Sequence, residues 1–195
     1  MSKDKNIIHF VTGNIHKFNE VSNLFKQDDV NYTLKQMDIK TIEIQADTIK
    51  EVALFKLNSV KEKIINSFFV EDAGFFVDSP LKGFPGVYSS YVLKKIGNKG
   101  ILKLINDYDN SRAHFSAIIC LYFKPLNKIF SFEGNIKGKV SKSIRGKGGF
   151  GFDPIFTPEL NPNKTFAEIT TEEKNKISHR GQAVKKLIQF LKKKG

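Results

Sequence analysis

The sequence contains a single cysteine and no long uncharged apolar segment. Because Cys120 alone cannot form an internal disulfide framework, a reducing compartment is favoured and we expect a cytoplasmic protein. The longest uncharged apolar run, residues 117–123, is far too short to cross a bilayer, and the apolar run that follows residues 1–6 is too short for a signal peptide. We therefore expect no membrane partner.

Arginine is also scarce, although the chain is strongly basic. The 32 lysines and arginines give a net charge of +12, but only Arg112, Arg145 and Arg180 are arginines. Arginine is the usual bidentate reader of phosphates and base edges, so a lysine surplus favours a solvated surface over specific nucleic-acid binding. We expect no nucleic-acid partner and keep a basic RNA-binding module as an alternative.

Hydropathy patterns predict one mixed α/β domain over residues 1–195. A chain of this length can bury a substantial core, and no repeat or composition break divides it. The patterns predict strands at 7–12, 32–37, 68–70 and 75–77, an extended segment at 42–44, and a hairpin of 113–123 and 129–136. They predict helices after residue 14, from a Thr48–Glu51 capping box through Ile64, at 91–96, at 101–108 and from about Ser178. Residues 146–163 are expected to be mostly loop.

A glycine turn after the first predicted strand is a candidate anion site. At Thr12-Gly13-Asn14 the chain passes from strand to helix, which directs free backbone N–H groups and the positive end of the helix dipole to one place. His16 and Lys17 follow in the first helical turn, where basic residues are unfavourable unless an anion is bound. An exposed lysine in an ordinary strand–helix turn explains the local pattern equally well.

Three acidic residues indicate a site for a hard cation. Glu71-Asp72 ends an apolar predicted strand, at the edge where open α/β sheets bind ligands. Glu43 lies between two isoleucines and is expected to face away from them. Carboxylates without a His or Cys ligand set favour Mg²⁺, with Mn²⁺ as a substitute, shared with substrate phosphates. Each acid taken alone also fits a solvated strand end.

A lysine interrupts the apolar stripe of the helix that begins at Thr48. Lys56 lies seven residues after Ile49 and four before Val60, both of which belong to the stripe. Such a side chain either extends along the surface to solvent or enters a pocket. Spacing alone favours the route to solvent.

The glycine-rich run 146–151 formally matches G-x-G-x-x-G. Asp153 and Pro154 follow where a helix should open, which excludes a dinucleotide site, and they would also disrupt the central strand of an RNA-binding motif. The two aromatic residues around Gly151, Phe150 and Phe152, either stack on a base or belong to the core.

The predicted start of the last helix carries three residues of interest. Ser178 is the expected N-cap, which lets His179 and Arg180 project from the first turn as hydrogen-bond donors. Basic residues at a helix N-terminus have no local electrostatic reason, so a ligand with acceptor atoms is expected there.

Taken together, these motifs resemble the inosine triphosphate pyrophosphatase (Ham1-like) family, which removes non-standard purine nucleotides. The matching segments follow the family's order and span nearly the whole chain: Thr12-Gly13-Asn14 with Lys17, Glu43-Ile44-Gln45, Glu71-Asp72, Gly83-Phe84-Pro85-Gly86-Val87-Tyr88, Glu133-Gly134, Gly149-Phe150-Gly151-Phe152-Asp153-Pro154-Ile155-Phe156, and Lys174-Asn175 with Ser178-His179-Arg180. Each motif alone is weak, but the ordered set is specific.

The resemblance implies an elongated two-lobed α/β domain around a curved mixed β-sheet, with an active-site cleft between the lobes, and a homodimer. It implies a small-molecule nucleotide substrate: ITP, dITP and XTP would be hydrolysed to the monophosphate and pyrophosphate with Mg²⁺. A pyrophosphatase of similar fold that acts on pyrimidine or modified nucleotides is the alternative within enzymes.

The resemblance also assigns roles to individual residues. The triphosphate would be held by Thr12, Gly13, Asn14, Lys17 and Lys56. Mg²⁺ would be bound by Glu43 and Asp72 with Glu71 nearby, and Asp72 would also orient or deprotonate the attacking water. The base and sugar would contact Phe150, Gly151, Phe152, Asp153, Lys174, His179 and Arg180, of which Phe150 stacks on the base. Donors from His179 and Arg180 would match the 6-oxo and N7 acceptors of hypoxanthine or xanthine.

Three positions depart from the family's pattern. Ser89-Ser90-Tyr91 stands where many members have Ser-Ala-Arg, so the function of that arginine is in question. Ala73 replaces a usual Ser or Thr and removes a hydroxyl near the predicted metal, and Phe152 stands where Trp or Tyr is common.

Overall fold

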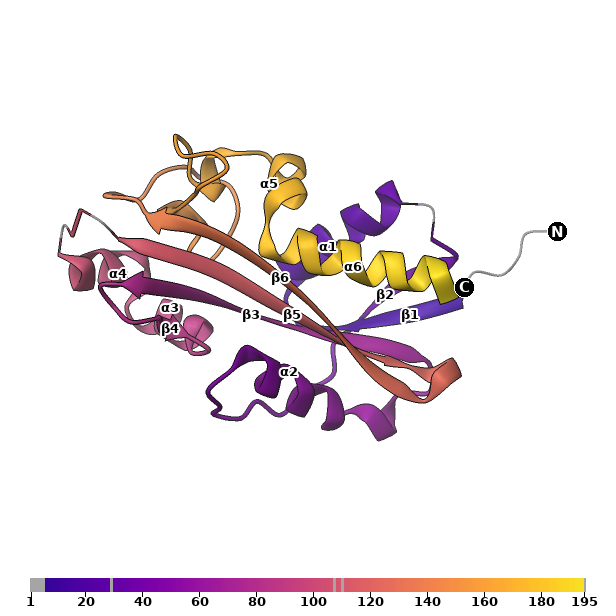
Figure 1. The fold of residues 1–195 in the computed structure, drawn as a ribbon. Coiled ribbons are helices and arrows are strands. Elements are labelled where there is room, and N and C mark those ends of the chain that lie inside the picture. The colour runs from indigo at the N-terminus through magenta and orange to yellow at the C-terminus, as the bar shows by residue number, and fades with distance from the viewer. Residues whose placement is uncertain (1–5, 29, 107, 110, 195) are drawn as a thin grey trace.

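Three long strands determine the shape of the molecule. The structure is a computed structural model that describes residues 6–28, 30–106, 108–109 and 111–194. Strands β3 (Ser67–Ser79), β5 (Arg112–Phe123) and β6 (Lys128–Val140) pair antiparallel along most of their length. They run from one end of the molecule to the other, which makes it elongated (Figure 1). The predicted N-terminal segment 1–5 lies outside the described residues.

Shorter strands extend this sheet on both sides. The order is β2-β1-β3-β5-β6-β7, and β4 pairs separately with β3. The added strands are β1 (Asn6–Val11), β2 (Tyr32–Met37), β4 (Phe84–Gly86) and β7 (Phe156–Pro158). Strand β1 is parallel to both β2 and β3, whereas the other pairs are antiparallel, so the sheet is mixed as predicted.

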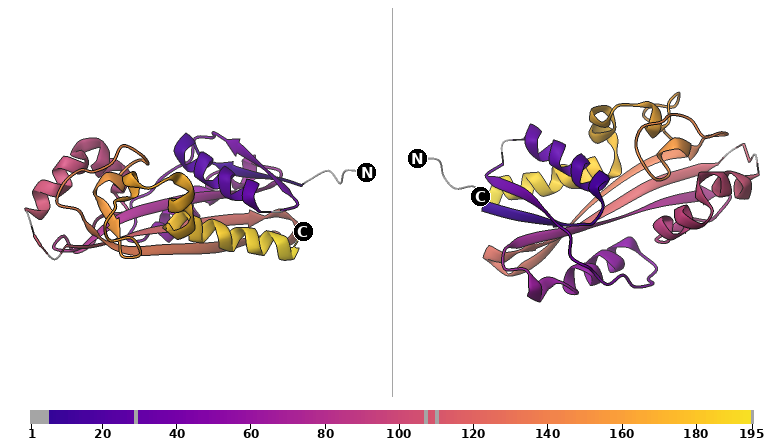
Figure 2. Two further views of the ribbon diagram at one scale, coloured as in Figure 1. Left: turned by 90° about the horizontal axis from the view of Figure 1, so that it is seen from above. Right: turned by 180° about the vertical axis from the view of Figure 1, so that it is seen from behind.

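Helices cover both faces of the sheet. Helices α1 (Ile15–Gln27), α5 (Thr171–Ile177) and α6 (His179–Lys194) lie on one side, and α2 (Ile49–Asn58) lies on the other (Figures 1 and 2). Helices α3 (Ser89–Lys95) and α4 (Gly97–Ile105) lie at the far end from β1. Short 3₁₀ turns occur at Lys61–Lys63, Lys124–Leu126, Asp153–Ile155 and Phe166–Glu168. No helix in the described ranges is long and apolar enough to span a membrane.

The hydrophobic core is divided between two lobes. In the first lobe, one cluster packs between the sheet and helices α1 and α6, and its buried members include Phe10, Val21 and Leu187. A second cluster packs between the sheet and α2, and its buried members include Ala53, Leu57 and Val70. In the second lobe, aromatic rings dominate, and Phe75, Phe115, Phe156 and Phe166 contact one another. The predicted two-lobed α/β architecture is confirmed.

Two predicted element ends were wrong. The strand expected to end at Glu71-Asp72 continues to Ser79, because β5 pairs with β3 on both sides of these acids. The helix that begins at Thr48 has the predicted capping box but ends at Asn58, and the 3₁₀ turn that follows brings Ile64 into the core. Residues 42–44, which were predicted to be an extended segment, belong to no regular helix or strand.

A glycine lets helix α6 approach the sheet. A Cβ atom at Gly134 of β6 would lie 2.0 Å from the carbonyl oxygen of His179 and 2.8 Å from the amide nitrogen of Ala183. Both neighbours are backbone atoms of α6, so the helix itself would have to move. The Glu133-Gly134 motif is thus explained by the close contact that positions the first turn of α6.

We expect Gly134→Ala to destabilise the protein by about 2 kcal/mol or more, as overpacking does in other cores. For a chain of this size, the melting temperature should fall by roughly 4–8 °C in thermal denaturation. Lys137→Ala, at an exposed position of the same strand, is the matched control and should melt like the wild type. Equal melting temperatures for the two variants would contradict the proposed contact.

Candidate active site

A cleft of about 890 Å³ lies between the two lobes. Its lining from the first lobe includes Thr12, Lys17 and Lys56, and its lining from the second includes Tyr88 and Phe150. Strand β1 pairs with β3 only as far as Phe10 and Phe69, so the rest of β3 extends beyond the carboxyl end of β1. This edge of a parallel pair is where α/β sheets bind ligands. The prediction of a cleft at Glu71-Asp72 therefore holds, although these acids lie within a strand.

The glycine turn has fewer free N–H groups than the sequence suggested. The side chain of Asn14 is the N-cap of α1 and accepts hydrogen bonds from the backbone N–H groups of His16 (3.0 Å) and Lys17 (3.2 Å). The hydroxyl of Thr12 accepts a third, from the N–H of Asn14 (3.1 Å). The turn is therefore held by its own side chains, and Gln36 supports it from β2 by donating to the Thr12 carbonyl (2.9 Å).

The lysine of this turn already has an anion. Lys17 Nζ lies 2.6 Å from Glu71 Oε2, and the Glu71 side chain is fully buried. Burial tends to raise the pKa of Glu71, but the adjacent Arg180 and Lys17 outweigh it and hold the pKa below its usual value. Glu71 is therefore a permanent counter-ion, which answers the local electrostatic problem posed by Lys17.

The other two acids meet at Lys56. Residues 71 and 72 are consecutive in a strand and point to opposite faces, so Asp72 faces α2 while Glu71 faces α1 and α6. Lys56 Nζ lies 2.6 Å from Glu43 Oε1 and 3.5 Å from Asp72 Oδ1. The side chain of Lys56 is 11% exposed, so it enters the cleft, and the expectation that it extends to solvent was wrong. Glu71 does not converge with Glu43 and Asp72.

Asp72 and Glu43 differ in basicity. Burial raises the pKa of Asp72, and the positive charges of Lys17 and Lys56 offset this only in part. The hydrogen bond from Lys56 lowers the pKa of Glu43, whose side chain is 64% exposed. Asp72 is thus the stronger base of the pair, and the positive charges of Lys17 and Lys56 lie near it in the cleft.

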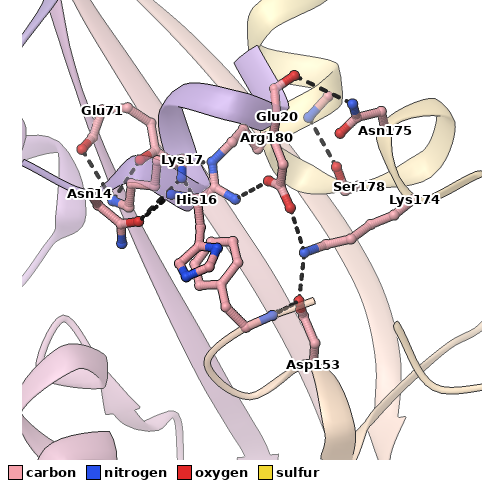
Figure 3. Close-up of polar contacts among 12 residues, drawn as sticks. Asn14, His16, Lys17, Glu20, Glu71, Asp153, Lys174, Asn175, Ser178 and Arg180 are labelled. Carbon is pink, nitrogen blue, oxygen red and sulfur yellow. Dashed lines mark hydrogen bonds and ion pairs between the residues drawn. The ribbon is translucent and has the colours of Figure 1, made fainter. Parts of the chain in front are cut away.

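Six side chains of alternating charge form a continuous buried chain, shown in Figure 3. In order, its members are Lys17, Glu71, Arg180, Glu20, Lys174 and Asp153. Beyond the first pair, the guanidinium of Arg180 lies 3.0 Å from Glu71 and 2.5 Å from Glu20, and Lys174 Nζ lies 2.8 Å from Glu20 and 2.6 Å from Asp153. The chain links β3, α1, α5, α6 and the 3₁₀ turn at Asp153, and so connects both lobes.

Arg180 uses its donors within this chain. Its Nε and Nη2 atoms bond to Glu71, and its Nη1 atom bonds to Glu20. Ser178 caps α6 as predicted, because its hydroxyl accepts the N–H of Gly181 (3.0 Å). The structure therefore places Arg180 at the predicted turn and in the cleft lining, but as a buried ion-pair partner that is 2% exposed.

His179 has a different environment. It is 3% exposed, and its ring stacks on Phe115 with centroids 4.7 Å apart. Burial lowers the pKa of His179 well below 6.5, and the nearby Arg180 and Lys174 lower it further, so the ring is neutral. Its Nδ1 atom has no hydrogen-bond partner among the described residues. A neutral imidazole in the cleft lining can donate one hydrogen bond and accept another.

The two aromatic residues next to Gly151, Phe150 and Phe152, lie in different environments. Phe150 is partly exposed, lines the cleft, and stacks on the exposed His16 with ring centroids 5.4 Å apart. Phe152 is 3% exposed and stacks on Phe75 in the core of the second lobe, so it forms the floor rather than a free stacking surface. Gly151 adopts φ +69°, which favours glycine, and its carbonyl accepts a hydrogen bond from Asn98.

Sequence reasoning missed Glu20. This residue is 5% exposed on α1 and is the only described group that bonds to both Arg180 and Lys174. A signal was present: Glu20 precedes Val21 and lies four residues before Leu24, within the buried face of its helix.

The fold and the cleft define an α/β protein whose site has an acid-and-lysine end in one lobe and an aromatic end in the other. The sequence profile of the Ham1 family matches residues 8–190. This chain therefore belongs to the Ham1 family.

Curated relatives and solved structures agree with this assignment. The dITP/XTP pyrophosphatase of Thermococcus kodakarensis is 45% identical over 183 residues, which cover 94% of this chain and 96% of the relative. That of Pyrococcus horikoshii is 44% identical and covers 95% of this chain and 96% of its own. A HAM1 protein structure from Coxiella burnetii has a TM-score of 0.82 and 28% identity, and covers 96% of this chain and 99% of its own. The Staphylococcus aureus Ham1 protein structure has a TM-score of 0.78 and 28% identity, and covers 97% of this chain and all of its own.

We expect Glu20→Gln to destabilise the protein, because both Arg180 and Lys174 would lose a buried counter-charge. Breaking a buried ion pair costs about 3–5 kcal/mol, and glutamine keeps the shape and one acceptor, so we expect about 3 kcal/mol. The melting temperature should fall by roughly 6–12 °C. Glu172→Gln, at an exposed position of α5, is the control. A Glu20→Gln variant that melts like this control would contradict the counter-ion role.

We also expect His179 to make the stability of the protein depend on pH. Because the folded-state pKa lies below 6.5, the unfolded chain binds more protons at acidic pH, and stability must fall as pH drops through 6.5. His179→Gln removes this proton, so its thermal stability relative to the wild type should rise from about pH 7.5 to about pH 5. Parallel stability profiles for the two proteins would argue against a neutral buried imidazole.

Proposed function

We propose that this protein hydrolyses the non-standard purine nucleoside triphosphates ITP, dITP and XTP to the monophosphate and pyrophosphate. The main support is one cleft that combines two lysines and two carboxylates at one end with a partly exposed aromatic ring, Phe150, at the other. A nucleoside triphosphate has the matching arrangement, since its phosphates are anionic and its base is planar. The activity named for the Thermococcus and Pyrococcus relatives supports the same reaction.

A magnesium ion fits the acidic end of the cleft. Glu43 and Asp72 both lie within 3.5 Å of one cation, the ammonium group of Lys56, so their oxygens already converge on a positive charge. Among the described residues, no cluster of three or more His, Cys, Asp or Glu side chains could hold a metal alone. Mg²⁺ commonly uses one or two carboxylates and completes its shell with water and substrate phosphates. Mn²⁺ suits the same ligands.

The residues of this end divide the chemistry between them. The metal, when bound, neutralises charge on the phosphates as pyrophosphate leaves. Lys17 and Lys56 supply further positive charge and hold the triphosphate in the cleft. Asp72, with its raised pKa, orients a water molecule and accepts its proton as the water attacks the α-phosphorus. Glu71 is not a metal ligand in this proposal, because its carboxylate pairs with Lys17 and Arg180 across the strand.

The aromatic end selects the base. Phe150 provides a stacking surface, and stacking contributes to all purines alike. Selection therefore depends on directional hydrogen bonds, for which the His179 side chain in the cleft lining is the candidate group. Arg180 shapes this end and has few donors left, since Glu71 and Glu20 engage its nitrogens. Asp153 and Lys174 close the same end through their ion pair.

The departure at Ser89-Ser90-Tyr91 leaves the cleft with another cation. The hydroxyl of Ser89 is used structurally, since it accepts the N–H of Phe75 (2.7 Å) and donates to the carbonyl of Gly86 (2.6 Å). Lys94, one helical turn after Tyr91, lines the cleft, and its charge contributes to the low pKa of Glu43. Lys94 would supply positive charge at the mouth in place of the missing arginine.

A homodimer and a cytoplasmic location are part of the proposal. The family resemblance supports the homodimer, and exposed apolar side chains such as Phe84, Tyr91 and Ile96 offer surface for the other subunit. The single, fully buried Cys120 supports the cytoplasmic location, because cysteines stay reduced in that compartment. Sedimentation velocity measures the oligomeric state directly, and a monomer at all concentrations would exclude the homodimer.

The decisive experiment measures released pyrophosphate with ITP, dITP, XTP, GTP, ATP and pyrimidine triphosphates, with and without Mg²⁺. We expect rapid release from ITP, dITP and XTP only when the metal is present. A preference for ATP or for a pyrimidine triphosphate, or the release of orthophosphate instead of pyrophosphate, would overturn the proposed reaction.

We expect Asp72→Asn to reduce ITP turnover by at least about 100-fold, the effect of losing a general base. Asparagine keeps the size of the side chain, so the melting temperature should stay close to that of the wild type. Asp78→Asn lies on the same strand and face but outside the cleft, and it should retain full turnover. Comparable kcat values for the two variants would rule out Asp72 as the base.

A further inference from the structure

A second ring, that of His16, lies against Phe150 beside the aromatic end of the cleft, although His16 is not itself among the residues that line the cleft. The imidazole of His16 lies over Phe150 with the two ring planes inclined by 19° and their centroids 5.4 Å apart. His16 is exposed in the first turn of α1, next to Lys17 of the phosphate end (Figure 3). The two nearly parallel rings belong to different lobes, since His16 comes from α1 and Phe150 from the loop before the 3₁₀ turn at Asp153.

One wall of this pair is fixed and the other can move. The backbone N–H of Phe150 donates to Asp153, and the cationic groups of Lys174 and Arg180 lie 4.8 and 5.3 Å from its ring centroid. These contacts tie Phe150 to the buried charge chain. The backbone of His16 is held by the Asn14 cap, but no hydrogen bond or ion pair is recorded for its side chain among the described residues. Rotation about its side-chain bonds can therefore widen the gap.

The two stacked rings leave no space between them for a planar ligand. Two van der Waals layers need about 7 Å between the outer rings, at about 3.5 Å each. The present centroid separation of 5.4 Å lets the rings contact each other with nothing between them. Because the two rings are already in contact, the exposed imidazole would have to move away by about 3.5 Å, the thickness of one layer, to admit a purine ring.

We infer that His16 is a second base-binding residue, which closes over the purine so that the base lies between the His16 and Phe150 rings. The inference rests on the proposed function, because it assumes that Phe150 stacks on the base. The phosphate turn and the upper wall of the base site are then one segment, Asn14 to Lys17. Because His16 is adjacent to Lys17 in the chain and contacts Phe150, a nucleotide that reaches from Lys17 to Phe150 would pass His16.

Two other roles for His16 predict different results. If His16 only fills the site in the absence of ligand, its removal should strengthen nucleotide binding, because no ring contact has to be broken. If His16 acts through the phosphate turn, its removal should weaken the binding of any polyphosphate, with or without a base. The sandwich arrangement alone requires an effect that depends on the base and on an aromatic ring at position 16.

The test measures the binding of an ITP analogue with a non-hydrolysable α,β-imido bridge by calorimetry, together with the binding of inorganic tripolyphosphate. Three variants are compared with the wild type: His16→Ala, His16→Phe and His114→Ala. The last is a matched control, because His114 stacks on Phe76 with centroids 4.6 Å apart, and neither residue lines the cleft.

We expect His16→Ala to weaken binding of the analogue by about 5-fold or more, as the loss of one stacking partner does elsewhere. His16→Phe should restore the affinity to within about 2-fold, since a phenyl ring stacks equally well. Tripolyphosphate should bind all the variants alike, and His114→Ala should match the wild type. In steady-state assays, the loss in His16→Ala should appear in KM for ITP, with kcat nearly unchanged.

Three outcomes would overturn the inference: unchanged or tighter binding of the analogue by His16→Ala, an equal loss of tripolyphosphate binding, or no recovery in His16→Phe. Failure of the proposed function would look different. A wild-type protein that binds the analogue but releases no pyrophosphate from ITP would refute the reaction and leave the stacking result valid. A wild-type protein that does not bind the analogue would refute both.

Discussion

The alternating chain from Lys17 to Asp153 is the constraint on which the rest of the site depends. Burying six charges is unfavourable unless each has a partner of opposite sign, and here every interior member has two. The chain therefore fixes the distance between α1, α5, α6 and β3, and with it the spacing between the two ends of the cleft. Phe150 is positioned through the same chain, since Asp153 accepts its backbone N–H. The net charge of the six groups is zero, and in the rest of the cleft lining Lys56 and Lys94 face the two carboxylates Glu43 and Asp72.

Local patterns predicted the elements whose cause is local. Strand β2 matches its predicted bounds, the β5–β6 hairpin occurs as expected, and both the Thr48–Glu51 capping box and the Ser178 cap are present. Each of these depends on residues within a few positions of one another. The ordered motifs likewise placed most of the predicted substrate residues around one cleft, although no single motif was specific.

The errors concern interactions between residues far apart in the sequence. Strand β3 continues past Glu71 because β5, some 45 residues later, supplies its hydrogen bonds, and the segment's own pattern contains no sign of this. Lys56 turns inward because Glu43 and Asp72 attract it, which outweighs the tendency of lysine to reach solvent. Local sequence predicts that Arg180 is a free donor, because its partner Glu20 lies 160 residues away. Pairings of buried charges are tertiary information, and periodicity reports only which face a residue occupies.

Strand β3 also limits how the chain length can vary. Consecutive residues of a strand face opposite sides of the sheet. Glu71 therefore reaches Lys17 and Arg180 on one side, and Asp72 reaches Lys56 on the other, only because each occupies its present position along β3. Inserting or deleting one residue between Ser67 and Glu71 would exchange the two acids. An aspartate would then have to reach Arg180, and a glutamate would stand beside Lys56. The length of the turn at Lys124–Leu126 is not constrained in this way, because the turn is exposed and joins two strands beyond the cleft. Length changes are therefore tolerable at the hairpin tip and incompatible with activity in the first half of β3.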